Sequence, residues 1–260
     1  MAFVVKFDLE ITALHESTTE NMNMKKTFHT LRLTTLIFAS LIFIFSCIAQ
    51  KSKVEVGNNW EGEIAAFDKL NQTEKYPDNS LLFIGSSSIR LWSTIKEEMA
   101  PYPIIQRGFG GSNSPAVAQY AERIVYPHQF RAVVIFIAND ITGSPDDLTP
   151  KESTATFRKI IKTIRTKYRK QPIFLIEITP SQSRWKKWPL IQEDNALLKA
   201  LCHKQKNLYF IETAQNFLDE KGEPRNELFR DDHLHLNREG YKIWGKLIKA
   251  EIDKILKDKG

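Results

Sequence analysis

Residues 132–137, with the sequence AVVIFI, give the strongest indication of the fold. All six side chains are apolar, and four of them are β-branched. Because successive side chains of a strand point to opposite faces of a sheet, an uninterrupted apolar run is buried on both faces. The pattern predicts a central strand of a parallel sheet with helices covering each side.

Four other short apolar runs have the length and composition of buried strands. They are Leu81–Ile84, Pro103–Ile105, Ile173–Ile178 and Leu208–Ile211. Apolar residues recur at helical spacing in the segments 60–67, 91–99, 117–124, 157–168, 190–201 and 241–255. Strands that alternate with helices form right-handed crossovers, so we expect an α/β protein, a three-layer α/β/α sandwich around a five-stranded parallel sheet.

Two of these helices carry recognisable start signals. Thr149 and Glu152 have the spacing of a capping box, with Pro150 at the first helical position. Asn237 is a favourable N-cap for the last helix.

Polar side chains follow the predicted strands. Ser86-Ser87-Ser88 follows the first strand, a glycine-rich turn at 108–111 follows the second, and Asn139-Asp140 follows the third. An Asp-x-x-His pattern at 232–235 precedes the last helix. Ligands of such sheets bind beyond the carboxyl ends of the strands, so we expect these segments to meet at one edge. A hydroxyl, backbone donors, a base and a carboxylate are the components of nucleophilic acyl transfer.

These segments resemble the four ordered blocks of the SGNH/GDSL hydrolases, and the resemblance runs from about 81 to 241. It implies a flavodoxin-like SGNH fold and a serine esterase, a hydrolase acting on carboxylic esters, with no metal and no organic cofactor. In the family, the serine of the first block is the nucleophile. Ungapped alignment places Ser87 there, with Ser86 and Ser88 as neighbouring alternatives.

The other blocks carry over residue by residue. Gly111 corresponds to the oxyanion-hole glycine of the second block, and Asn139 to the asparagine of the third. The Ser87 N–H is expected to be the third donor to the oxyanion. Asp232 and His235 match the last block and complete a Ser-His-Asp triad.

The sequence departs from the family pattern at three positions. Ser86 replaces the usual aspartate, Gln106 the usual asparagine, and Ile137 the usual glycine. Ser86 and Ile137 leave open a different class of function, a non-catalytic glycan-binding or cell-surface module.

Elementary chemistry supports the same roles. A serine hydroxyl is a weak nucleophile until a base takes its proton, and a histidine side chain ordinarily titrates near neutral pH. An aspartate three residues before the histidine can reach its far ring nitrogen and hold it in the required tautomer.

The substrate is less constrained. With export and short loops at the strand ends, the resemblance to the family implies small acyl esters of small molecules or glycans, such as acetyl esters on carbohydrate. A lysophospholipase or thioesterase of the same fold is the enzymatic alternative. Arg184, Trp185 and Trp188 lie in a loop that we expect at the same edge, where they either contact substrate or pack on the core. Asp231, Asp232, His233 and His235 leave a metal site as a further alternative.

The N-terminal region has the pattern of an export signal. Lysines and an arginine precede the apolar run 36–45, and the sequence around Cys47 resembles a lipobox. We therefore expect residues 1–23 to be an over-extended start or disordered, 24–49 to be a signal peptide and 50–260 to be the hydrolase domain. The protein would be exported, either free or membrane-tethered through a lipidated Cys47.

Composition excludes several classes of protein. The 260 residues are 42% hydrophobic and 26% charged, which excludes a disordered or multi-span membrane chain. The 37 basic and 31 acidic residues give a net charge of +6 but no basic run, so we expect no nucleic-acid partner. The sequence leaves the oligomeric state open. Cys202 is expected in the core.

Overall fold

The computed structural model describes residues 60–257. The chain divides into two units, Met1–Gly57 and Asn58–Gly260, and the described residues all belong to the second unit. The predicted segment 1–23, the signal peptide at 24–49 and Cys47 lie outside the described residues. Across residues 60–257, no helix combines the length and the apolar character needed to cross a bilayer.

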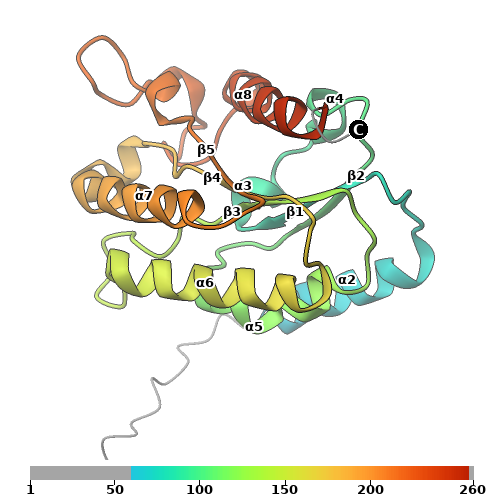
Figure 1. The fold of residues 1–260 in the computed structure, drawn as a ribbon. Helices are drawn as coiled ribbons and strands as arrows, with labels where there is room; N and C mark the ends of the chain where they lie inside the picture. The colour runs from blue at the N-terminus through green and yellow to red at the C-terminus, as the bar shows by residue number, and fades with distance from the viewer. Residues whose placement is uncertain (1–59, 258–260) are drawn as a thin grey trace, which may run out of the picture. The chain divides into compact units, whose positions relative to one another are not determined.

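A five-stranded parallel sheet forms the centre of the fold, as predicted (Figure 1). The strand order is β2-β1-β3-β4-β5, which puts the AVVIFI strand in the middle. The strands are β1 (Leu81–Gly85), β2 (Ile104–Gly108), β3 (Ala132–Phe136), β4 (Ile173–Ile176) and β5 (Leu208–Ile211).

Helices cover both faces of the sheet, and alternate strand residues contact each layer. Leu82 and Ile84 of β1 pack in one core, whereas Leu81 and Phe83 pack in the other. The first core is closed by α2 (Glu61–Thr73), α5 (Ser114–Val125), α6 (Pro150–Lys167) and α7 (Trp188–His203). The second is closed by α3 (Ser87–Arg90), α4 (Ile95–Glu98) and α8 (Arg238–Lys257) (Figure 1). Three short 3₁₀ turns complete the described elements, η1 (Gln182–Lys187), η2 (Ala214–Phe217) and η3 (Asn226–Leu228).

Both predicted helix starts are confirmed. Thr149 and Glu152 form the reciprocal bonds of a capping box at the start of α6. The Asn237 side chain accepts the Gly240 N–H at 3.0 Å at the start of α8. Buried Cys202 lies in the core, and burial raises the pKa of its thiol to about 12.

One helical prediction is wrong. The apolar spacing of 91–99 predicts a single helix, but the chain leaves the helical path between α3 and α4. The Gln106 side chain bonds at the break, where its amide donates to the carbonyl oxygens of Ile89 at 2.6 Å and Trp92 at 3.2 Å. The same carbonyls also accept the N–H groups three residues later, Trp92 at 3.2 Å and Ile95 at 3.3 Å, as in a turn and not in an α-helix.

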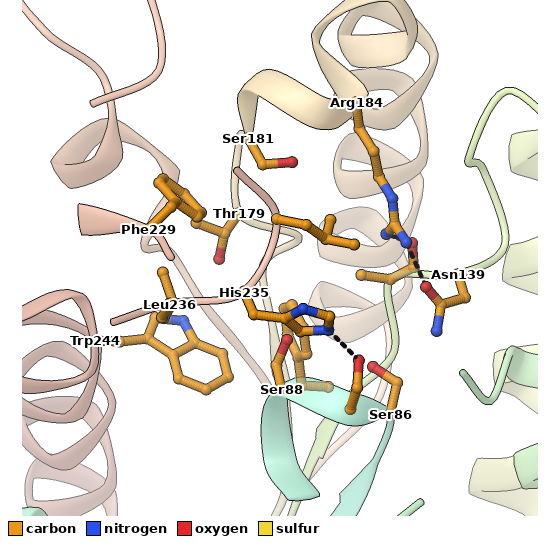
Figure 2. A pocket seen from close by; sticks show the side chains of 14 residues that line it. Ser86, Ser88, Asn139, Thr179, Ser181, Arg184, Phe229, His235, Leu236 and Trp244 are labelled. Atoms are coloured by element: carbon orange, nitrogen blue, oxygen red, sulfur yellow. Dashed lines mark hydrogen bonds between the residues drawn. The ribbon is translucent and has the colours of Figure 1, made fainter. Parts of the chain in front are cut away.

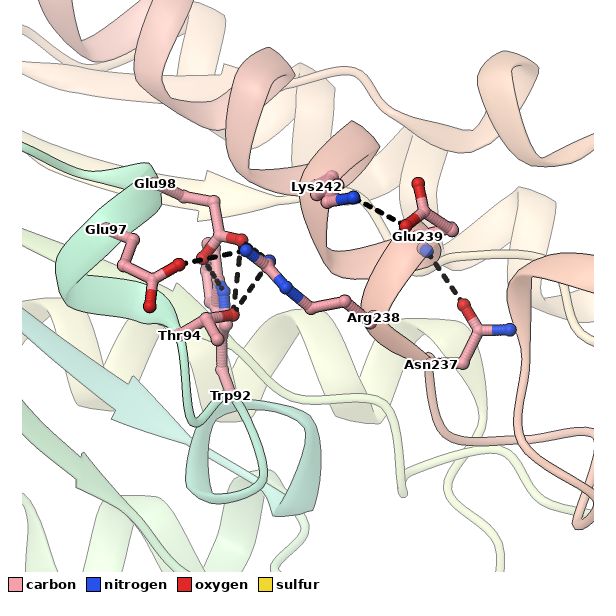
Figure 3. A network of polar contacts seen from close by, with 9 residues as sticks. Trp92, Thr94, Glu97, Glu98, Asn237, Arg238, Glu239 and Lys242 are labelled. Carbon is pink, nitrogen blue, oxygen red and sulfur yellow. Dashed lines mark hydrogen bonds and ion pairs between the residues drawn. The ribbon is translucent and has the colours of Figure 1, made fainter.

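A polar network links the start of α8 to α4 (Figure 3). Arg238 donates to Glu97 at 2.9 Å and also pairs with Glu98. Glu98 in turn accepts the indole N–H of Trp92 at 2.9 Å. The network holds the first turn of α8 in place immediately after the segment that contains His235.

The turn from β1 to α3 depends on a glycine. Gly85 has a φ of +134°, and a Cβ there would lie 1.9 Å from the Phe136 carbonyl oxygen of β3. The next residue, Ser86, donates its N–H to that same oxygen at 3.0 Å. Strands β1 and β3 therefore approach too closely at this point for any side chain.

We predict that Gly85→Ala lowers the free energy of unfolding by at least about 2 kcal/mol, because it adds a forbidden φ to a steric overlap. Gly62→Ala is the matched control, since nothing lies within 4 Å of a Cβ built at Gly62. In helix α2 that change should add about 0.5–1 kcal/mol of stability. Urea denaturation followed by circular dichroism measures both, and equal stability of Gly85→Ala and the wild type would contradict the close approach.

Candidate active site

Ser87 is the first residue of α3, directly beyond the Gly85 turn. Its hydroxyl meets the imidazole of a residue 148 positions later, with 2.8 Å between Ser87 Oγ and His235 Nε2. Figure 2 shows the His235 ring facing the serine cluster. Of the three adjacent serines, Ser87 is the one whose hydroxyl contacts His235 within the described residues.

Asp232 holds the other side of the imidazole. Its Oδ2 lies 2.7 Å from His235 Nδ1, and its Oδ1 accepts the backbone N–H groups of Leu234 and His235, both at 2.9 Å. Burial raises the pKa of Asp232, but these hydrogen bonds outweigh it and hold the pKa at about 2. The carboxylate is therefore charged at neutral pH and fixes the ring with Nε2 towards Ser87.

Asn139 follows β3 and faces the same space. Its Nδ2 donates to the Ser112 carbonyl oxygen at 3.0 Å, and its Oδ1 accepts from Arg184. The side-chain amide is thus held at both ends beside the serine turn.

Gly111 lies in the turn after β2, with a φ of +68°. Helix α2 and the residue before it fix this turn. The Gly110 carbonyl accepts the Trp60 indole N–H at 2.8 Å, and the Gly110 N–H donates to Glu63 at 3.2 Å. Gly111 does not line the cavity at Ser87, so its role in an oxyanion hole stays a prediction.

The sequence profile of the GDSL-like Lipase/Acylhydrolase family matches residues 85–243. The chain belongs to this family. No curated protein sequence matches the chain closely enough to count as a relative.

Solved structures show that the fold is that of the SGNH hydrolases. A Bacteroides fragilis protein provisionally described as an acylhydrolase is 22% identical, with a TM-score of 0.65 over 74% of this chain and 96% of its own. A GDSL-like lipase from Bacteroides thetaiotaomicron is 19% identical, with a TM-score of 0.61 over 74% and 98%. A carbohydrate esterase family 3 protein from Talaromyces cellulolyticus is 13% identical, with a TM-score of 0.56 over 69% and 99%.

In this GDSL-family chain, Ser87 opens into a cavity of about 430 Å³ that includes the solvent at its mouth. Polar residues Asn139, Thr179, Ser181, Arg184 and His235 line part of it. Large apolar side chains form much of the remaining wall, namely Phe136, Phe229, Leu234, Leu236 and Trp244. Figure 2 shows Phe229, Leu236 and Trp244 among them. The bulk of these side chains limits the space next to the serine.

Two polar atoms of the cavity wall lack a partner within residues 60–257, Thr179 Oγ1 and Trp244 Nε1. Both are buried, and a buried donor without a partner costs free energy. A water molecule or an oxygen atom of a ligand could bond to them. This wall of the cavity therefore offers hydrogen-bonding groups as well as aromatic rings.

The two tryptophans of the predicted substrate loop lie elsewhere. Trp185 and Trp188 stack on each other, with 6.0 Å between ring centroids, and pack against Ile178 and Ile191. Neither lines the cavity at Ser87, whereas Arg184 does. The packing matches the core alternative for the tryptophans, and a substrate contact for them stays a prediction.

The metal alternative has no support in the described part of the chain. Within residues 60–257, no three His, Cys, Asp or Glu side chains are grouped so that they could hold a metal ion. Asp232 and His235 bond to each other instead. A cofactor-free mechanism remains a prediction.

The residue after Asn139, Asp140, belongs to a buried pair of acids joined by Ser153. Ser153 Oγ lies 2.9 Å from Asp140 Oδ2 and 2.9 Å from Asp194 Oδ2. A hydroxyl has one proton, so both contacts are hydrogen bonds only if one carboxyl is protonated. Burial raises the pKa of Asp194 to about 7, and its Oδ1 is unpartnered. Asp140 instead receives the Ser114 N–H at 2.7 Å, so Asp194 is the group that keeps the proton.

Sequence reasoning missed Ser153 and Asp194. The available signal was Asp194 itself, a charged residue on the inward helical face that also carries Ile191, Leu198 and Leu201. A carboxyl at a core position requires a buried partner or a proton.

We predict that Asp194 makes stability fall with rising pH. Its pKa in the folded state, about 7, exceeds the ordinary aspartate value near 4, so the folded chain binds the extra proton. The stabilisation of the folded chain by this proton is complete below about pH 4 and is lost as pH rises through 7. Asp194→Asn supplies a permanent donor to Ser153, so relative to the wild type it should gain about 2 kcal/mol between pH 5 and pH 8.

Urea denaturation at the two pH values measures this gain. Asp78→Asn replaces an exposed aspartate and is the matched control, expected to change stability by less than about 0.5 kcal/mol at either pH. If the free energies of unfolding of the wild type and Asp194→Asn differ by the same amount at pH 5 and at pH 8, Asp194 is not the titrating group.

Proposed function

We propose that the protein is a serine esterase that hydrolyses short acyl esters through an acyl-enzyme. The observation that carries the proposal is the 2.8 Å contact between Ser87 Oγ and His235 Nε2 at the mouth of a cavity. Membership of the acylhydrolase family supports the same reaction class.

In the proposed reaction, Ser87 Oγ bonds to the ester carbonyl carbon while His235 Nε2 takes the hydroxyl proton. Asp232 stabilises the imidazolium that results. The C–O bond to the alcohol then breaks, and His235 returns its proton to the leaving oxygen. Water, deprotonated by the same imidazole, attacks the acyl-enzyme and releases the carboxylic acid and free Ser87.

The oxyanion needs donors that are in place before it forms. The Ser87 N–H lies in the first turn of a helix, where amide donors have no intrahelical partner. We propose that this N–H, the Gly111 N–H and the Asn139 amide hold the oxyanion.

A small acyl group fits the surroundings of Ser87 best. Phe136, Phe229 and Trp244 close the space beside the nucleophile. Within residues 60–257, the exposed large hydrophobics are Leu70 and Leu190, and neither lines the cavity. The likeness of the fold to a carbohydrate esterase and to an acetyl esterase favours acetyl esters on carbohydrate. Export, proposed from residues 24–49 alone, would bring the enzyme to extracellular glycans.

We predict that a fluorophosphonate probe labels Ser87 and that Ser87→Ala abolishes labelling and lowers kcat on p-nitrophenyl acetate by about 10⁴-fold or more. Ser88→Ala tests the neighbouring serine, and this variant should keep both the probe labelling and the kcat of the wild type. Mass spectrometry of the labelled peptide identifies the site. A chain that folds but neither labels nor hydrolyses esters would favour the non-catalytic module, and activity lost on chelation would favour a metal.

A second prediction concerns acyl length. Because bulky side chains limit the cavity, kcat/KM should fall by at least about 10-fold between p-nitrophenyl acetate and the decanoate. The Ser87→Ala variant corrects for background hydrolysis at each length. A preference for the decanoate, or for a lysolipid over acetylated sugars, would point to the lysophospholipase alternative.

A further inference from the structure

Arg184 reaches from η1 to the end of β3 and contacts two oxygens there. Its guanidinium donates from Nη1 to the Ala138 carbonyl oxygen and from Nη2 to Asn139 Oδ1 (Figure 2). We propose that Arg184 is the positioning residue that orients the Asn139 amide towards the oxyanion, an inference that rests on the proposed function. This assigns Arg184 a task different from the substrate contact expected from the sequence.

Counting hydrogen-bond groups on Asn139 supports the proposal. The amide nitrogen has two N–H groups, and one donates to the Ser112 carbonyl oxygen at 3.0 Å. The other is left for a ligand in the cavity, which Asn139 lines. The amide oxygen is held by the guanidinium.

The alternative orientation of the amide is unfavourable at both ends. A half-turn would set the amide NH₂ against the donors of Arg184 and the amide oxygen against the carbonyl oxygen of Ser112. Donor would face donor, and acceptor would face acceptor. The two neighbours together therefore select the orientation in which an N–H remains for the oxyanion.

The charge of Arg184 adds to this effect. Arg184 forms no ion pair with a carboxylate of residues 60–257, so its bonded partners are the two carbonyl-type oxygens. Burial lowers the pKa of its guanidinium to about 10, partly offset by Asp147 and Asp140, so the group is charged at neutral pH. A cation bonded to the amide oxygen polarises the amide and makes its N–H a stronger donor.

The loop that carries Arg184 is itself tied to the histidine segment. The Ser183 N–H donates to the His233 carbonyl oxygen at 3.2 Å, and the Arg184 N–H to Ser181 at 3.1 Å. The geometry thus links the segments on either side of the cavity through one 3₁₀ turn.

A double-mutant cycle tests the inference with p-nitrophenyl acetate as the substrate. Asn139→Ala should lower kcat by about 10²–10³-fold, as expected for one oxyanion donor. Arg184→Met should lower kcat by about 10-fold or more while KM changes less than about 2-fold, since it acts on the transition state. In the Asn139→Ala background, Arg184→Met should change kcat by less than about 2-fold, because its target is absent.

Two further variants separate positioning from fold maintenance. Arg184→Lys retains the charge but not the paired donors, so its kcat should lie between those of the wild type and Arg184→Met. Lys186→Met changes an exposed cation of the same turn and should leave kcat unchanged. Thermal unfolding of each variant shows whether the fold is intact, and Arg184→Lys carries the test if Arg184→Met does not fold.

The outcomes are distinct. A raised KM, or losses from Arg184→Met and Asn139→Ala that multiply, would mean that Arg184 contacts the substrate and would overturn the inference alone. The inference would also be overturned if Arg184→Met left kcat unchanged in an enzyme whose Ser87 reacts with the fluorophosphonate probe. A wild type that neither labels nor hydrolyses esters would overturn the proposed function and this inference together.

Discussion

The hydrogen bond between Ser87 and His235 joins residues that lie 148 positions apart, and the rest of the site is arranged around it. It forms because parallel strands end at a common edge, where the α3 turn and the segment before α8 meet. The turn itself is possible only because Gly85 lets β1 approach the Phe136 carbonyl. Backbone contact between two buried strands therefore determines the position of the Ser87 hydroxyl.

Around this bond, the polar groups are restrained from several sides. Asp232 uses both oxygens on the histidine segment, and Asn139 is held by Ser112 and Arg184. Next to Asn139 in the sequence, Asp140 bonds to the Ser153 hydroxyl, which also bonds to Asp194. Such restraint suits catalysis, since donors that are already oriented need no reorganisation when charge develops.

Much of the fold could be predicted from the sequence because its signals are local. An all-apolar run such as 132–137 has few solutions other than a buried strand, and the capping box at Thr149 depends on neighbouring residues only. The helix expected over 91–99 is interrupted next to the Gln106 amide of β2, which bonds to the carbonyl oxygens of Ile89 and Trp92, a contact between distant segments. The tryptophans at 185 and 188 could not be placed, since a loop aromatic can pack inward or face the cavity with the same sequence.

The order of the elements, the family and the residues with suitable chemistry follow from the amino-acid sequence alone, because apolar periodicity, helix capping and short motifs are properties of neighbouring residues. Only the tertiary structure decided which serine meets the imidazole, that Arg184 bonds to Asn139, and that a second carboxyl is buried beside Asp140. These are contacts between distant segments. Their distances depend on how the layers pack, and no local pattern encodes that packing.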